Sequence, residues 1–205
     1  MNWSLKSFHL LPAAAILLLS SCAATQVSLD YQPTSGQIIK GSPIMSVGRF
    51  ANSRNEDSYY LGVVRTPIGT PIEFIQTRTP IEEIVHNAFS HACSARGMLT
   101  SPSKARYVIT GEVLDLYAQQ LVRPYGYARI RVNIVKGSTG QIMFSRVYAG
   151  ERQNPAYRPG SGSPVPGLRE LVSRALQDAV DRAMDDPEMR GRIQSGGVSY
   201  QPGML

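Results

Sequence analysis

The sequence predicts an α+β fold: a two-layer sandwich in which two amphipathic helices pack on one face of a mostly antiparallel sheet. Two patterns predict it. Apolar residues recur with a helical period over residues 81–92 and again over residues 168–184. Between these helices, residues 127–135 alternate between apolar and polar side chains, which is typical of a sheet covered on one side only. The helices and the sheet then bury their apolar sides against one another.

The N-terminal residues have the layout of a secretory signal. Lys6 precedes an apolar run over residues 10–19, which at about ten residues is shorter than the roughly 20 that cross a bilayer. The sequence Leu19-Ser20-Ser21-Cys22 follows and resembles a bacterial lipobox. The resemblance implies cleavage between Ser21 and Cys22 and acylation of Cys22. The alternatives are a secreted protein cleaved near Ala24 and a cytosolic protein with an apolar start.

A lipid on Cys22 would anchor the chain to a membrane without a transmembrane helix, because two or more acyl chains hold a protein stably on a bilayer. In lipoproteins that are retained in the inner membrane, an Asp usually follows the lipidated Cys directly. In this sequence Ala23 and Ala24 follow Cys22 instead. The expected location is therefore the outer membrane of a Gram-negative bacterium, on the side that faces the periplasm.

Composition divides the rest of the chain. Residues 22–42 are polar and contain Pro33, so they are expected to form a flexible tether. Residues 43–190 are expected to form a single α+β domain. Residues 191–205 are polar and Gly-containing, which predicts a disordered tail.

The net charge is positive but not concentrated. The chain has 21 Lys and Arg against 15 Asp and Glu, and loss of Lys6 with the signal leaves a net charge of +5. Arg129, Arg131 and Arg146 gather in the strand region, and the other basic residues are spread out. The chain has no basic stripe interleaved with aromatic residues, so a nucleic-acid partner is not expected.

The first half of the domain contains three expected strands and a helix. Residues 43–50 have the alternating character of a strand, and residues 59–64 and 72–75 flank a turn with Pro and Gly, which predicts a hairpin. Thr79-Pro80-Ile81-Glu82 has the form of a capping box, with Thr79 as the N-cap of the helix. Gly97 supplies the C-terminal stop.

Three strands and a second helix follow. The alternation over residues 106–117 slips at Val113-Leu114, which indicates a β-bulge or burial on both faces. Residues 127–135 and 142–150 are joined by a short Gly-containing turn and are expected to pair as an antiparallel hairpin. After a Pro- and Gly-rich loop over residues 152–167, the second helix ends before Asp186-Pro187.

The polar side of residues 127–135 is the candidate interface for a partner, and it presents Tyr127, Arg129 and Arg131. Five tyrosines belong to the expected sheet, where they serve either cross-strand packing or an aromatic face for a partner. They are Tyr107, Tyr117, Tyr125, Tyr127 and Tyr148.

The sequence contains no recognisable catalytic constellation, so no enzymatic activity, cofactor or metal site is expected. His86 and His91 are five residues apart, whereas two metal ligands on one helix face are three or four apart. Cys93 is the only cysteine after Cys22, which predicts a buried, inert thiol and no internal disulfide. The acidic residues of the second helix are expected to be solvated ion-pair partners of Arg174 and Arg182. They are Asp178, Asp181 and Asp185.

Several segments share their features with one family. Besides the lipobox and the strand near residues 44–50, they are Ser94-Ala95-Arg96-Gly97, Tyr107-Val108-Ile109-Thr110-Gly111-Glu112-Val113, Leu171-Val172-Ser173-Arg174-Ala175-Leu176 and Asp185-Asp186-Pro187. In these segments the chain resembles the YajG-like family of bacterial lipoproteins. The resemblance implies a non-enzymatic envelope protein.

The expected function is that of a non-catalytic, lipid-anchored outer-membrane lipoprotein that binds a protein partner or an envelope component. The alternative is an auxiliary lipoprotein of a lipid or lipopolysaccharide transport system, which predicts an apolar groove between helix and sheet. A third hypothesis, a hydrolase acting on cell-wall material, predicts polar groups with shifted pKa values in a cleft. The sequence leaves the partner and the oligomeric state open.

Overall fold

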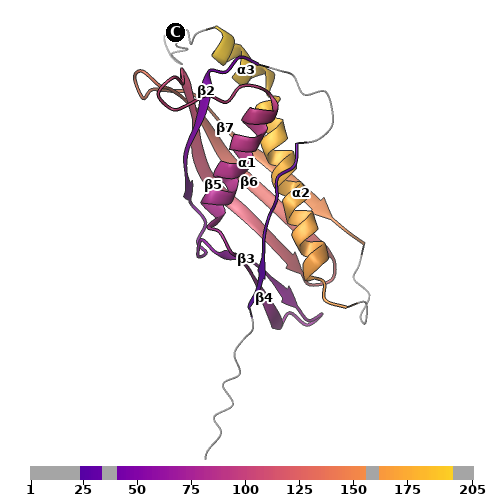
Figure 1. Ribbon diagram of the computed structural model, residues 1–205. Helices are drawn as coiled ribbons and strands as arrows, with labels where there is room; N and C mark the ends of the chain where they lie inside the picture. Colours follow the sequence, from indigo (N-terminus) through magenta and orange to yellow (C-terminus); the bar gives the residue numbers. More distant parts are fainter. Residues whose placement is uncertain (1–23, 34–40, 156–161, 196–205) are drawn as a thin grey trace, which may run out of the picture.

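A computed structural model describes residues 24–33, 41–155 and 162–195, and it has the expected α+β architecture (Figure 1). One seven-stranded sheet packs against helices. The strands are β1 (Ala24–Val27), β2 (Met45–Asn52), β3 (Tyr60–Arg65), β4 (Pro71–Thr77), β5 (Tyr107–Gln120), β6 (Pro124–Lys136) and β7 (Ile142–Gln153). The helices are α1 (Ile81–Ala95), α2 (Val165–Met184) and α3 (Pro187–Gln194).

The centre of the sheet is the antiparallel meander β5-β6-β7, which confirms the expected hairpin. On the other side of β5 the order continues through β3 and β4 to β1, and β2 also pairs with β5. The pairs β2–β5, β3–β5 and β1–β4 are parallel. The expected hairpin of β3 and β4 is confirmed, and the register of β5 shifts between Val113 and Asp115, as a β-bulge requires.

Helices α1 and α2 lie on one face of the sheet (Figure 1), and the hydrophobic core fills the space between the helices and the sheet. Phe89 of α1 is completely buried and stacks on Phe50 of β2, with 5.1 Å between ring centroids. Helix α2 approaches the sheet very closely at Gly126 and Gly150. A Cβ atom on Gly150 would lie 2.0 Å from the carbonyl oxygen of Ala175, so this contact requires a residue without a side chain.

The start of α1 differs from the expected capping box. Pro80, not Thr79, is the N-cap, and no side chain caps the helix. Instead, the Ile81 N–H donates to the carbonyl oxygen of Ser58 at 2.9 Å, and Glu82 accepts a hydrogen bond from the Ser58 hydroxyl at 3.1 Å. The prediction of Thr79 as the cap was wrong because the loop before β3 supplies the partners that a local cap would have supplied.

The folded part of the chain is longer than expected at both ends. Residues 24–33 were predicted to belong to a flexible tether, yet Ala24–Val27 forms β1 beside β4 and Tyr31 is buried. At the other end, α3 continues to Gln194, beyond the expected limit of residue 190. The predicted signal sequence, its cleavage site at Ser21 and the lipidation site Cys22 lie outside the described residues, as do residues 196–205 of the predicted tail.

A buried ion-pair cluster ties residues 24–33 to the helices. The Arg96 side chain, only 3% exposed, donates to Asp181 at 3.2 Å and to Asp185 at 3.1 Å. The Tyr31 hydroxyl donates to Asp181 at 2.6 Å. Burial lowers the pKa of Arg96, but its hydrogen bonds to Asp185 and Tyr31 raise it more, so the guanidinium stays charged.

The predicted partners of the α2 acidic residues were therefore wrong. Arg152 of β7 pairs with Asp178 at 2.7 Å. Arg174 pairs with Glu170, and Arg182 donates to the carbonyl oxygen of Ala149. The spacing along α2 allowed pairs within the helix, but residues of the neighbouring elements bind these carboxylates.

Within the described ranges, no helix is both long enough and apolar enough to cross a bilayer.

Candidate functional site

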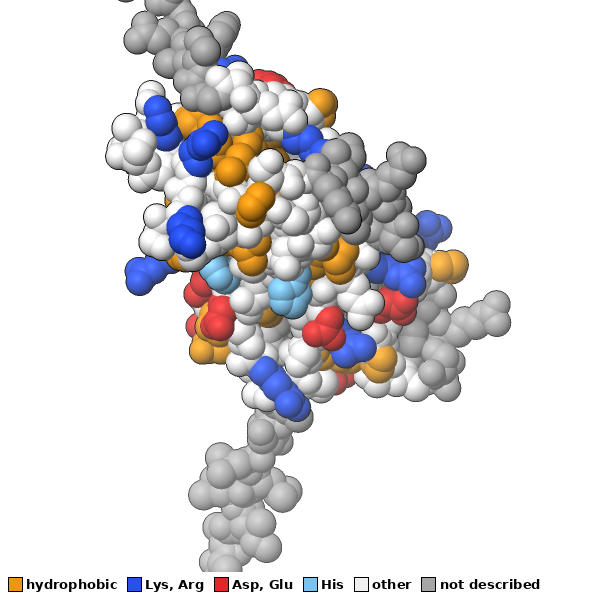
Figure 2. Space-filling view, turned by 45° about the horizontal axis from the view of Figure 1, so that its top comes forward, with side chains coloured by type: hydrophobic (Ala, Val, Ile, Leu, Met, Phe, Trp, Pro, Cys, Tyr) orange, Lys and Arg blue, Asp and Glu red, His pale blue; other side chains and the backbone are white. Residues whose placement is uncertain are grey.

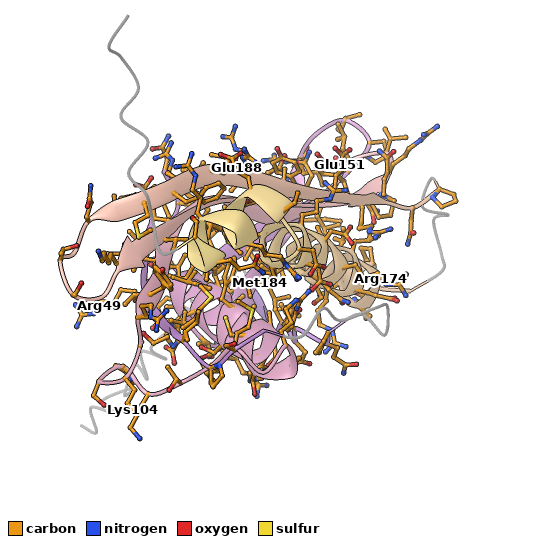
Figure 3. The ribbon with its side chains drawn as sticks, turned by 90° about the horizontal axis from the view of Figure 1, so that it is seen from above. Arg49, Lys104, Glu151, Arg174, Met184 and Glu188 are labelled. Carbon is orange, nitrogen blue, oxygen red and sulfur yellow. The ribbon has the colours of Figure 1, made fainter. Side chains whose placement is uncertain are left out.

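The face of the sheet opposite α1 and α2 is the candidate site. No described helix lies over this side of β5, β6 and β7 (Figures 1 and 3). Residues paired directly across neighbouring strands point to the same face. We call the outward-pointing side chains of these three strands the open face. The structure confirms the alternation expected over residues 127–135. Ala128, Ile130, Val132 and Ile134 are fully buried, and the residues between them are partly or fully exposed.

Three tyrosines form a cluster on the open face. Tyr117 of β5 lies opposite Tyr127 of β6, with 5.6 Å between their ring centroids. Tyr125 lies 5.9 Å from Tyr117 and 6.1 Å from Tyr127. These separations are typical of aromatic pairs that contact one another, so the rings hold one another in place. All three tyrosines are partly exposed, so the cluster is accessible from solvent.

The hydroxyls of Tyr117 and Tyr125 are neutral at neutral pH. Burial raises the pKa of Tyr117, although its hydrogen bond with Tyr125 lowers it in part. Burial also raises the pKa of Tyr125, and the nearby Tyr117 and Glu151 raise it further. Each hydroxyl can therefore donate a hydrogen bond as well as accept one.

Arg129 and Arg131 extend the open face beyond the tyrosine cluster. Arg129 Nε lies 2.6 Å from Asp115 Oδ2, and Arg131 Nη1 lies 2.7 Å from Glu112 Oε2. Both pairs join β6 to β5, and both arginine side chains are about half exposed, at 48% and 41%. The carboxylates offset the charge of the two arginines, so this part of the face offers ordered polar groups instead of a strong positive field.

The structure separates residues that the sequence groups together. Arg146 points to the helix side of the sheet, where it pairs with Asp186 at 2.6 Å, so it does not join Arg129 and Arg131. Tyr107 and Tyr148 are buried, and Tyr148 donates to Asp186 at 2.7 Å. Only three of the five sheet tyrosines therefore contribute to the open face.

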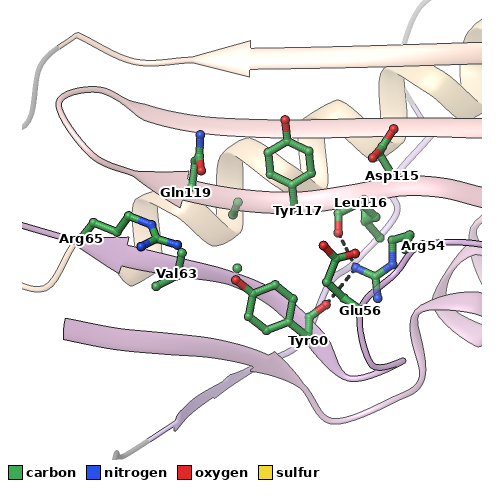
Figure 4. A pocket seen from close by; sticks show the side chains of 11 residues that line it. Arg54, Glu56, Tyr60, Val63, Arg65, Asp115, Leu116, Tyr117 and Gln119 are labelled. Carbon is green, nitrogen blue, oxygen red and sulfur yellow. Dashed lines mark hydrogen bonds between the residues drawn. The ribbon is translucent and has the colours of Figure 1, made fainter. Parts of the chain in front are cut away.

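A pocket adjoins the cluster where β5 changes its partner. β2 pairs with residues 107–113 of β5 and β3 pairs with residues 118–120, so residues 114–117 have no strand partner on that edge. Arg54 fills the gap, since its Nη1 donates to the carbonyl oxygens of Leu116 at 2.8 Å and Tyr60 at 2.9 Å (Figure 4). Sequence analysis did not identify Arg54, because nothing in the polar loop around it indicates which strand it reaches.

The cavity beside Arg54 has a volume of about 220 Å³. Its lining is polar and aromatic, and Tyr117 belongs both to this wall and to the tyrosine cluster. The other side chains that line it include Glu56, Tyr60, Arg65, Asp115 and Gln119 (Figure 4). The pocket and the cluster thus form one continuous site that can stack on planar or apolar groups and exchange hydrogen bonds with them.

The remaining sequence candidates have structural roles. Cys93 is completely buried, and burial raises the pKa of its thiol to about 12, so the thiol is inert at neutral pH. His86 Nδ1 lies 2.8 Å from the carbonyl oxygen of Gly48. Among the described residues, no three His, Cys, Asp or Glu side chains are placed to hold a metal ion.

The surface on the side of the helices has no field of one sign. Figure 2 shows Lys and Arg side chains interspersed with Asp and Glu, with histidine side chains and small apolar patches between them. The sequence candidates Tyr127, Arg129 and Arg131 lie together on the open face instead, and their binding of a partner stays a prediction.

Comparison with known proteins gives similarity of fold. A Xanthomonas campestris protein of family DUF330 is 14% identical, with a TM-score of 0.63 over 83% of this chain and 99% of its own. A second crystal structure, of an uncharacterized protein, is 9% identical, with a TM-score of 0.51 over 78% of this chain and 96% of its own. A minor lipoprotein from Acinetobacter baumannii has a TM-score of only 0.38, with 11% identity over 67% of this chain and 94% of its own. No protein-family model and no curated protein matches the chain.

Proposed function

We propose that this protein is a non-catalytic lipoprotein, anchored by Cys22 to the periplasmic side of the outer membrane, that binds an envelope protein through its open face. The tyrosine cluster beside the Arg54 pocket carries this proposal. Tyrosine and arginine are enriched at the centres of protein interfaces, because they combine a large contact area with hydrogen bonding. Here both residue types stand on a rigid sheet, so little side-chain entropy is lost on binding.

The anchor is supported by the sequence before β1. The lipobox-like Leu19-Ser20-Ser21-Cys22 ends two residues before Ala24, the first residue of β1. The folded domain therefore begins almost directly after the proposed lipid. Ala23 and Ala24 support the outer membrane as the destination.

Binding is favoured over catalysis by the composition of the site. The open face combines clustered tyrosines with arginines that are already paired to carboxylates, and its polar groups serve recognition well. The alternative, an auxiliary lipoprotein of lipid transport, requires an apolar groove between helix and sheet. Phe89 and Leu176, which lie in that layer, are completely buried, so the partner-binding role is preferred.

In-cell photocrosslinking of the lipidated protein tests this function. A photoreactive amino acid at Tyr127 should give a discrete crosslinked product that mass spectrometry identifies as an envelope protein. The same group at Arg174, which is 62% exposed on α2, is the matched control and should give none. If both positions give the same products, or if Tyr127 gives none, the open face is not the interface. Cys22→Ser should release the protein from the membrane fraction, which checks the anchor separately.

A further inference from the structure

Half of the large exposed apolar side chains of the described residues lie in or directly beside two turns at one end of the sheet. Ile68, in the turn between β3 and β4, is 90% exposed, and Ile72, the second residue of β4, is 64% exposed. Leu121 is 42% exposed and Val122 is 60% exposed, on the turn between β5 and β6. We call these four residues the apolar tip.

The register of the sheet brings the two turns together. β3 and β5 are neighbouring parallel strands in which Val64 pairs with Gln120, so both strands end at the same end of the sheet. The turn that contains Ile68 follows β3, and the turn that contains Val122 follows β5. Neighbouring strands are about 4.8 Å apart, so the two turns are adjacent. Neither residues 66–72 nor residues 121–124 include an Asp or Glu, and Arg123 adds a positive charge.

β1, the first strand after the proposed anchor, begins near this same end of the sheet. Ala24 pairs with Phe74 in the parallel pair of β1 and β4, only two residues beyond Ile72. β4 runs away from the tip, so β1 does too, and Ala24 lies at the end of β1 that is nearer the tip. Consecutive Cα atoms are about 3.8 Å apart, which keeps the Cα of Cys22 within about 7.6 Å of that of Ala24. Figure 1 shows the N-terminal end of β1 beside the β3–β4 hairpin.

We propose that the apolar tip rests in the interface of the bilayer that holds the Cys22 lipid and so fixes the orientation of the domain. This inference depends on the proposed anchor. Apolar side chains next to a lipid attachment point gain by burial at the headgroup boundary, and Arg123 can face anionic headgroups. The strands then rise from the membrane, and Tyr125, which follows Pro124 at the tip, brings the tyrosine cluster close to the bilayer surface.

Depth-dependent fluorescence quenching tests this orientation. The lipidated, full-length protein is reconstituted in vesicles of phosphatidylethanolamine and phosphatidylglycerol, with and without brominated lipid. An environment-sensitive dye is attached to Ile68→Cys or Val122→Cys; Cys93 is buried and does not compete for the dye. Ile142→Cys is the matched control. Ile142 is 57% exposed, but it lies at the start of β7, at the opposite end of the sheet from the tip.

The dyes at positions 68 and 122 should shift to shorter wavelength on vesicle binding and lose emission with brominated lipid, and the dye at position 142 should do neither. Equal emission at all three positions on vesicle-bound protein overturns the proposal. A shift that needs no vesicles and grows with protein concentration also overturns it, since the tip would then join two copies of the chain. Sedimentation of the parent protein with vesicles, compared with that of Cys22→Ser, reports on the anchor, so failure of the anchor is distinguished from failure of the tip.

Discussion

Arg96 is a buried cation whose partners come from two segments that are both far from it in the sequence. It pairs with Asp181 and Asp185, and Tyr31 is hydrogen-bonded both to Asp181 and to Arg96 itself. Arg96→Ala should lower the free energy of unfolding by about 3 kcal/mol, because it removes a guanidinium that is only 3% exposed and that pairs with the largely buried Asp181. Urea denaturation measures this loss. The control is Arg174→Ala, which removes an exposed pair with Glu170 and should cost no more than about 0.5 kcal/mol.

Asp186 makes the stability dependent on pH in the acid range. Burial raises the pKa of its carboxyl, but hydrogen bonds from Tyr148, the Met189 N–H and Arg146 lower it more, so the net shift is below the usual 3.8. A carboxyl with a depressed pKa stabilises the fold above 3.8, and this contribution is lost as the pH falls through the folded-state value. Denaturation of the wild-type protein and Asp186→Asn should therefore differ most at neutral pH and converge in acid. A constant difference across the range would contradict the assignment.

At the scale of the element, the contact of α2 with the sheet depends on two glycines. Gly150→Ala should destabilise the protein by about 1–3 kcal/mol, because its Cβ would overlap the carbonyl oxygen of Ala175 and force helix and sheet apart. Gly167→Ala, in the first turn of the same helix and in open space, should instead stabilise the protein by up to about 1 kcal/mol. Thermal denaturation of both variants makes the comparison.

Elements also differ in how far the sequence predicts them. The periods of α1 and α2 predict both helices, since a helix needs only its own residues and one apolar face. The bulge in β5 is visible as a slip in the alternation at Val113-Leu114. β1 is different: its four residues have no strong pattern, and only the free edge of β4 makes them a strand.

At the scale of the whole molecule, the packed core and the proposed binding surface lie on opposite sides of the sheet. Phe89→Ala should cost about 3–5 kcal/mol of folding free energy, because it empties the stacked position beside Phe50. Tyr127→Ser should leave the unfolding midpoint nearly unchanged and abolish the crosslinked product expected from the open face. Denaturation and in-cell crosslinking with a probe at neighbouring Tyr125 measure the two effects. Loss of stability comparable to that of Phe89→Ala would show that the tyrosine cluster serves the fold instead.

The candidate site was predictable only in part. Tyr127, Arg129 and Arg131 follow from alternation within one strand, because every second residue of a strand points to the same side. Tyr117 and Tyr125 join them through pairing between β5 and β6 and across the neighbouring turn. Arg54 belongs to a loop and contacts Leu116, which is 62 residues away in the sequence. No local pattern indicates that contact.

The sequence by itself determined the α+β class, the two helices, the central hairpin and the side of the strand that stays uncovered. These properties depend on the periodic placement of apolar residues within one segment. Tertiary structure alone decided that β2 and β3 share one edge of β5, that Arg96 binds Asp181 and Asp185, and that the apolar tip meets the start of β1. Such contacts join distant segments, and their energies depend on which groups the closed fold brings within reach.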